Sequence, residues 1–197
     1  MGRRKTHSRE ELLLKAMQVF REKGYAGTSA DLLVERIGVS RYSLYSDFGS
    51  KQGLFEAALQ RYNDDVISLR FGPLEQPDAS LQHILDLLAF YGEAADGPAA
   101  GLGCLLCNTA VEFGADDPSG DKFVERYFER LSGAFANALK NARKAGQLMP
   151  NVDVSQEADF LTSVVVGLFV LIRAKAPIPV IRHAAKAAQI HCETLAA

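Results

Sequence analysis

A group of side chains that can bond phosphates and base edges follows a glycine turn near the start of the chain. Ile37-Gly38-Val39-Ser40 predicts a tight turn, because Gly38 adopts a positive φ without steric cost and Ser40 can cap a following helix. The next segment, 41–48, is too short to be a stable helix by itself. A short polar helix braced against a partner helix is what entry into the major groove of DNA requires.

Each polar residue of this region has a predicted role at DNA. Arg41 is the leading base reader, because a guanidinium can donate two hydrogen bonds to guanine. Tyr42 suits a thymine methyl group or a sugar, and Thr28 can hold a phosphate at a helix N-terminus. The alternative interpretation of Tyr45 is a core residue that does not contact DNA. The predicted DNA-binding set is Thr28, Ser40, Arg41, Tyr42, Ser43, Tyr45, Ser46 and Lys51.

The same region resembles a known family. Thr28, the turn Gly38-Val39-Ser40 and the run Leu44-Tyr45-x-x-Phe48-x-Ser50-Lys51 are similar to the pattern of tetracycline-repressor (TetR) family regulators. The resemblance covers about the first 60 residues. Asp47 departs from the pattern, and it either accepts a hydrogen bond from cytosine or pairs with Arg41 or Lys51.

The resemblance implies an all-α fold with two parts. Residues 1–51 form a three-helix, helix-turn-helix DNA-binding head, and residues 52–197 form a helical ligand-binding and dimerisation body. A helix over 50–71 connects the two parts and ends at Gly72-Pro73. Helical periodicity predicts the remaining elements over 8–23, 79–95, 102–113, 119–145, 154–175 and 179–195.

Charge and composition agree with one end meeting nucleic acid. Residues 1–51 carry ten basic and six acidic residues, a net charge of +4, which leaves −6 for the remainder of a chain whose net charge is −2. Arg3, Arg4 and Lys5 are a candidate arm for the minor groove. We expect no membrane span, no signal peptide and, with three cysteines, reduced thiols in the cytoplasm.

The last two predicted helices indicate a homodimer. The segment 160–172 is apolar nearly all round, so it must be covered on more than one side. A second copy of the chain can cover one side, and a monomer core is the alternative. The predicted dimer seam is Leu161, Val164, Leu168, Leu171, Ile181, Ala184 and Ala188.

The middle of the chain holds the candidate ligand site. The resemblance implies a cavity among these helices, and the predicted lining is Phe90, Cys107, Asn108, Val111, Glu112, Tyr127, Leu131 and Phe169. Glu112 faces a ligand or forms a salt bridge to Arg126, Arg130 or Arg173. The Cys104-x-x-Cys107 pair has no second Cys/His pair for a structural zinc, so we expect no metal and no cofactor. The two thiols are buried small apolar residues or an electrophile sensor.

These observations predict a sequence-specific DNA-binding regulator. The preferred hypothesis is a homodimeric repressor that leaves a near-palindromic operator when a small-molecule effector binds. The alternatives are a thiol-based redox or electrophile sensor and an architectural DNA-binding protein without a ligand response. An enzyme is disfavoured, because the chain has no glycine-rich phosphate loop, G-x-S-x-G or H-E-x-x-H motif.

Overall fold

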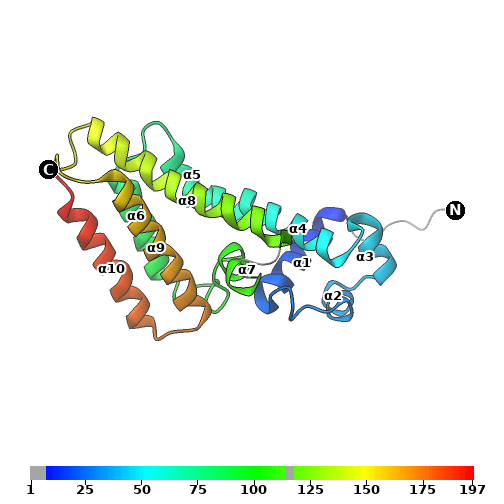
Figure 1. Ribbon diagram of the computed structural model, residues 1–197. Helices are drawn as coiled ribbons and strands as arrows, with labels where there is room; N and C mark the ends of the chain where they lie inside the picture. The colour runs from blue at the N-terminus through cyan, green and yellow to red at the C-terminus, as the bar shows by residue number, and fades with distance from the viewer. Residues whose placement is uncertain (1–7, 114–117) are drawn as a thin grey trace.

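The computed structural model describes the backbone of residues 8–113 and 118–197 and the side chains of 8–113 and 123–197. The candidate arm Arg3, Arg4 and Lys5 lies outside the described residues. Helices make up most of the described chain (Figure 1). They are α1 Arg9–Lys23, α2 Ala30–Ile37, α3 Arg41–Phe48, α4 Lys51–Tyr62, the π-helix η1 Asn63–Ile67, α5 Ser68–Glu75, α6 Leu81–Glu93, α7 Leu105–Phe113, α8 Pro118–Lys144, α9 Val154–Arg173 and α10 Ile178–Thr194.

The all-α prediction is confirmed. Within the described ranges, the β-type pairing is limited to an isolated bridge between Leu148 and Ala196. Helices α1–α3 gather at one end of the molecule, and α6, α9 and α10 form the other end (Figure 1). The α4–η1–α5 segment and the long helix α8 run between the two ends (Figure 1). A displacement of this middle layer would therefore reach both ends.

Local signals fix the first helix as the sequence predicts. Ser8 and Glu11 form a capping box, in which each side chain accepts a hydrogen bond from the other residue's backbone N–H. Leu12, Ala16 and Phe20 are buried on one face of α1. This face packs on α4, whose Phe55 ring lies 4.9 Å from that of Phe20.

The turn between α2 and α3 has the predicted geometry. Gly38 adopts a left-handed conformation with φ 82° and ψ 32°, and its N–H donates to the Val34 carbonyl. Ser40 caps α3 by accepting a hydrogen bond from the Ser43 N–H at 3.1 Å. Leu44 is fully buried under α3. One face of α3 is thereby held against the head, and the other face stays in solvent.

The connecting helix does not end at Gly72-Pro73, so that prediction is wrong. The chain continues from α4 through η1 into α5, which contains Pro73 and ends at Glu75. Gly72 has no Cβ to clash with the proline ring, which permits helical backbone at this step. Phe71 and Leu74 are buried, and the Phe71 ring lies 5.9 Å from that of Phe135 on α8. Tertiary packing therefore outweighs the local stop signal.

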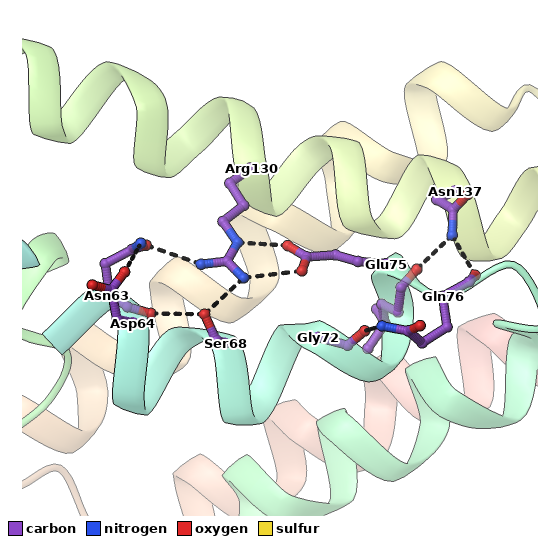
Figure 2. Close-up of polar contacts among 9 residues, drawn as sticks. Asn63, Asp64, Ser68, Gly72, Glu75, Gln76, Arg130 and Asn137 are labelled. Carbon is purple, nitrogen blue, oxygen red and sulfur yellow. Dashed lines mark hydrogen bonds and ion pairs between the residues drawn. The ribbon is translucent and has the colours of Figure 1, made fainter. Parts of the chain in front are cut away.

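A guanidinium from α8 holds the π-helical turn (Figure 2). Arg130 donates to the Asn63 side chain at 3.1 Å and to Ser68 Oγ at 3.0 Å, one contact at each end of η1. It also donates to both carboxylate oxygens of Glu75, at 2.5 and 2.9 Å. Asn137 of α8 also binds this segment, because its side-chain amide donates to the carbonyls of Leu74 and Gln76. The middle layer is thus joined by polar contacts as well as by apolar packing.

Two residues of α3 give a matched test of this arrangement. Leu44→Ala should lower the free energy of unfolding by about 2–5 kcal/mol, because it leaves a cavity under α3. Tyr42→Ala should change it by less than about 0.5 kcal/mol, because Tyr42 is 86% exposed. Chemical denaturation monitored by circular dichroism measures both. Equal effects of the two changes would contradict the orientation of α3.

Candidate nucleic-acid interface

The exposed face of α3 carries the side chains that the sequence predicts for base reading. Arg41, Tyr42 and Ser46 are exposed, and Ser43 and Tyr45 are half-buried at the edges of this face. Ser40 is exposed at the helix N-terminus, although its hydroxyl oxygen is occupied by the cap. On the opposite side, the Arg9 guanidinium stacks 4.7 Å from the centre of the Phe48 ring and fixes the end of α3.

Arg41 has a partner that DNA can replace. Its guanidinium donates to Asp31 at 2.7 Å, and the two side chains are 58% and 89% exposed. An ion pair this exposed contributes little to stability. Exchange of Asp31 for another hydrogen-bond acceptor would therefore cost little.

Two predicted DNA contacts, Thr28 and Lys51, have partners inside the head. The Thr28 side chain is fully buried, and its hydroxyl donates to the Gly24 carbonyl at 2.5 Å. Ser29 caps α2 instead, through the Leu32 N–H. Lys51 points inward: its ammonium donates to the Tyr25 carbonyl at 2.8 Å and lies 4.0 Å from the centre of the Tyr25 ring. Both residues thus shape the head from inside.

A cavity of about 170 Å³ lies where the head meets the body. Its wall is formed by residues of α1, α4, η1, α5, α6 and α9 and of the loop before α7. Of the predicted ligand-binding residues, Phe90 and Phe169 line it. The sequence missed the others because their chain positions are far apart: Arg21, Tyr62, Val66, Ile67, Arg70, Tyr91, Ala94, Ala99, Gly103 and Ile172.

The remaining predicted ligand residues lie outside this cavity. Asn108 donates to the Leu102 carbonyl at 2.9 Å, and Val111 is 75% exposed. Cys107, Tyr127 and Leu131 are buried. These positions therefore contribute no lining to the cavity.

The cysteines are buried free thiols. Cys104 Sγ lies 3.3 Å from the Tyr127 hydroxyl, and burial raises the pKa of Cys104. Burial also raises the pKa of Cys107 and of Cys192 to about 12. Only the thiolate is a strong nucleophile, and these thiols stay protonated near neutral pH. The geometry favours the interpretation as small apolar core residues. Within the described side chains, no cluster of His, Cys, Asp or Glu could hold a metal ion.

Glu112 contacts the head and not the arginines named as its alternatives. Its carboxylate accepts hydrogen bonds from the backbone N–H groups of Tyr25, at 2.9 Å, and Ala26, at 2.5 Å. These amides belong to the loop between α1 and α2, whereas Glu112 belongs to α7 of the body. Glu112 therefore clamps the loop that leads into the DNA-facing helices.

Two arginines complete this junction. Arg173, at the end of α9, donates to the carbonyls of Arg21 and Glu22, at 2.8 and 3.0 Å, where α1 ends. Arg21 donates through two nitrogens to the Gly103 carbonyl, at 3.2 and 2.9 Å. Gly103 has φ 61°, and a Cβ there would lie 2.9 Å from Arg173 Cβ, so only glycine fits. The end of α1 is thus bound to the body from two sides.

The predicted dimer seam is partly corrected. Leu161, Leu168, Ile181 and Ala188 are buried inside the single chain and have no surface left for a second copy. Val164, Leu171 and Ala184 are half-buried at the edge of the surface. The large apolar residues that remain exposed on α9 and α10 are Phe160, Val170, Ile178, Val180 and Ile190. The periodicity could not separate the two faces, because both are apolar.

Comparison with known proteins identifies the chain. The model of the tetR family of bacterial regulatory proteins matches residues 12–58, and that of the tetracyclin repressor-like C-terminal domain matches residues 80–188. The uncharacterized HTH-type transcriptional regulator YezE of Bacillus subtilis is 32% identical over 162 residues, which are 82% of this chain and 84% of that protein. The chain belongs to the TetR family.

Further relatives of this TetR family member include proteins named as repressors. The HTH-type transcriptional repressor ComR of Escherichia coli is 28% identical over 173 residues, 87% of this chain and 82% of that protein. A similar solved structure is a cysteine mutant of the TetR family regulator CifR with 26 bp double-strand operator DNA. Its TM-score is 0.82 at 25% sequence identity, and the match covers 95% of this chain and 98% of the CifR chain. This TetR protein is therefore a DNA-binding transcriptional regulator and not an enzyme.

Arg41 and Arg36 give a paired test of the interface. Arg41→Ala should weaken binding to a selected operator by about 1–3 kcal/mol and relax the preference at one base of each half-site. Arg36→Ala removes an equal charge from α2, where Arg36 pairs with Glu22 at 2.7 Å, and should leave base preference unchanged. Fluorescence anisotropy with single-base operator variants measures both. An equal loss on every sequence would reduce Arg41 to a phosphate contact.

The Glu112 clamp predicts a local change in dynamics. Glu112→Ala should speed hydrogen exchange at Tyr25 and Ala26 by about tenfold or more and lower the free energy of unfolding by about 1–2 kcal/mol. Glu129→Ala, at an exposed position of α8, serves as the control. Hydrogen exchange by NMR reports the individual amides. Unchanged exchange in the loop would show that Glu112 does not hold it.

Proposed function

We propose that the chain is a homodimeric transcriptional repressor that leaves a near-palindromic operator when a small effector binds between head and body. The main support for this proposal is the cavity, which is lined by Arg21 of the head and by Tyr62 and Ile67 of the connecting segment. An occupant would touch both parts at once. The proposed division is a head over 1–51 and a body over 52–197, with the protein acting in the cytoplasm.

In this proposal, α3 enters the major groove. Arg41 reads a base, and Tyr42 and Ser46 contact a base edge, a methyl group or the backbone. Ser40, Ser43 and Tyr45 lie at the edge of the same face and approach phosphates. Thr28 and Lys51 act indirectly, because their buried contacts shape the loop and the start of α4.

The proposed homodimer uses the exposed apolar faces of α9 and α10. Phe160, Val170 and Ile190 are 43%, 46% and 49% exposed, and Val164 and Gly167 lie between them on α9. A twofold axis through this surface would join four helices and bury the same patch on each copy. Helix α9 is long and apolar enough to cross a membrane by length and composition. Its burial of Leu161, Val165 and Leu168 in the body supports a core helix with one face for a partner.

The proposed release couples the cavity to the spacing of the two heads. A twofold dimer places its recognition helices about one DNA turn apart, about 34 Å, so a small tilt of each head spoils the fit. An effector that favours the tilted state weakens operator binding in proportion to its preference for that state. A 100-fold loss of affinity takes about 2.7 kcal/mol of coupling.

Selection of bound DNA from a random pool tests the proposed function. We expect an enriched inverted repeat with half-sites about one helical turn apart, because a twofold dimer presents two identical heads. A single half-site would contradict the dimer, and no enrichment would favour the architectural alternative. Small organic compounds that release the selected operator then test the effector step.

The dimer surface has its own test. Val170→Glu should convert the dimer to a monomer and reduce operator affinity by about 100-fold or more, because it places a charge in an apolar interface. Leu69→Glu introduces the same charge at a 66% exposed apolar position on α5 and should leave the dimer intact. Analytical ultracentrifugation measures the mass of each variant. A dimer that tolerates Val170→Glu would place the interface elsewhere.

A further inference from the structure

The cavity between head and body has an unusual charge distribution. It is lined by two guanidinium groups, Arg21 and Arg70, and within the described side chains no carboxylate lines it. Neither arginine has an ion-pair partner in the described part of the chain. Both are half-buried. Two half-buried cations without a counter-charge make a site that favours an anion.

The two guanidinium groups are held by aromatic rings. Arg70 Cζ lies 3.6 Å from the centre of the Phe90 ring, and Arg21 Cζ lies 5.6 Å from that of Tyr62. Burial and the nearby Cys104 raise the pKa of Tyr91, while Arg70 and Arg21 act in the opposite direction. Both cations are therefore close enough to influence the Tyr91 hydroxyl, which stays protonated and able to donate a hydrogen bond.

The rest of the lining is apolar. Val66, Ile67, Phe169 and Ile172 face the cavity together with the Phe90 and Tyr91 rings. The volume of about 170 Å³ is small. Apolar cavities of about 150 Å³ accept a benzene-sized molecule. The lining and the size thus suit one aromatic ring or a short branched alkyl group.

We propose that this cavity binds a small monocarboxylate with an aromatic or branched apolar body. The carboxylate pairs with Arg21 and Arg70, and the apolar body packs against Phe90, Phe169 and Ile172. The proposal rests on the proposed function, since it gives the chemical class of the effector at that same site. Arginine suits the task because its planar fork donates parallel hydrogen bonds to a carboxylate.

The assignment also gives the ligand a direct chemical path to the head. Arg21 belongs to α1 and donates to the Gly103 carbonyl of the body. A carboxylate competes with this neutral carbonyl for the same N–H groups, and a charged acceptor forms the stronger bond. Pairing with the ligand therefore weakens one of the two attachments at the end of α1, while Arg173 keeps the other.

Calorimetric titration with three probes of nearly equal shape tests the charge preference. Benzoate, benzamide and benzylamine differ mainly in the charge of one substituent. Wild-type protein should bind benzoate at least about tenfold more tightly than benzamide and should not bind benzylamine measurably. Comparable affinity for benzamide, binding of benzylamine, or absence of benzoate binding would each overturn the proposal. This series needs no variant.

A matched pair of variants assigns the charge to Arg70. Arg70→Gln should weaken benzoate binding by about tenfold or more and leave any benzamide binding unchanged. Arg182→Gln removes an arginine that pairs with Glu93 and Asp96 outside the cavity and should leave benzoate binding unchanged. Equal losses in the two variants would overturn the assignment.

The same samples separate this inference from the proposed function. The wild-type protein is also titrated with its selected operator, with and without saturating benzoate. Operator binding without benzoate binding overturns the ligand class and leaves the repressor proposal standing. Benzoate binding that leaves operator affinity unchanged supports the ligand class and overturns effector release.

Discussion

The structure depends most on how the C-terminal end of α1 is attached to the body. A helix end leaves carbonyl groups without intrahelical partners, and here Arg173 of α9 donates to two of them. Cations at this end also complement the helix dipole. Beyond the helix end, the Glu112 carboxylate accepts hydrogen bonds from the amides of Tyr25 and Ala26 in the α1–α2 loop. The body thus supplies both the cation for the helix end and the anion for the loop, and these contacts fix the direction in which α2 and α3 leave α1.

The connecting layer is held together by polar contacts across its π-helical turn. The π-helical turn η1 leaves irregular hydrogen bonding in the middle of a long helix, and such turns often mark functional sites. Arg130 spans this turn and binds Glu75 beyond it, so α5 and η1 are fastened to α8 (Figure 2). Helix α4 in turn packs on α1 through the Phe20 and Phe55 rings. The boundary between the part packed on α1 and the part fastened to α8 therefore lies near Tyr62, next to the cavity.

Local signals made the head predictable from the sequence. The helix ends and the cavity of the body depend on long-range packing and could not be predicted in the same way. Gly38 and Ser40 act within a few residues of themselves, so the turn and the cap are confirmed. The stop expected at Gly72-Pro73 failed because Phe71 and Leu74 are buried against other helices. The inner face of α9 could not be told from its outer face, since valines and leucines occupy both. Residues brought together from six helices, such as Arg21 and Arg70, leave no local pattern that marks a cavity.

One side chain joins recognition to geometry. Arg21 lines the cavity and also donates two hydrogen bonds to the Gly103 carbonyl. If the same N–H groups bind an anion, the hydrogen bonds between α1 and the body weaken. Gly103 lies so close to Arg173 that a Cβ there would be 2.9 Å from Arg173 Cβ. Arg173 holds the last turn of α1 by donating to the carbonyls of Arg21 and Glu22. In the proposed homodimer, a ligand that draws Arg21 inward would leave the Arg173 contacts at the end of α1 in place, so the proposed change in head spacing needs a rotation of the head and not its detachment.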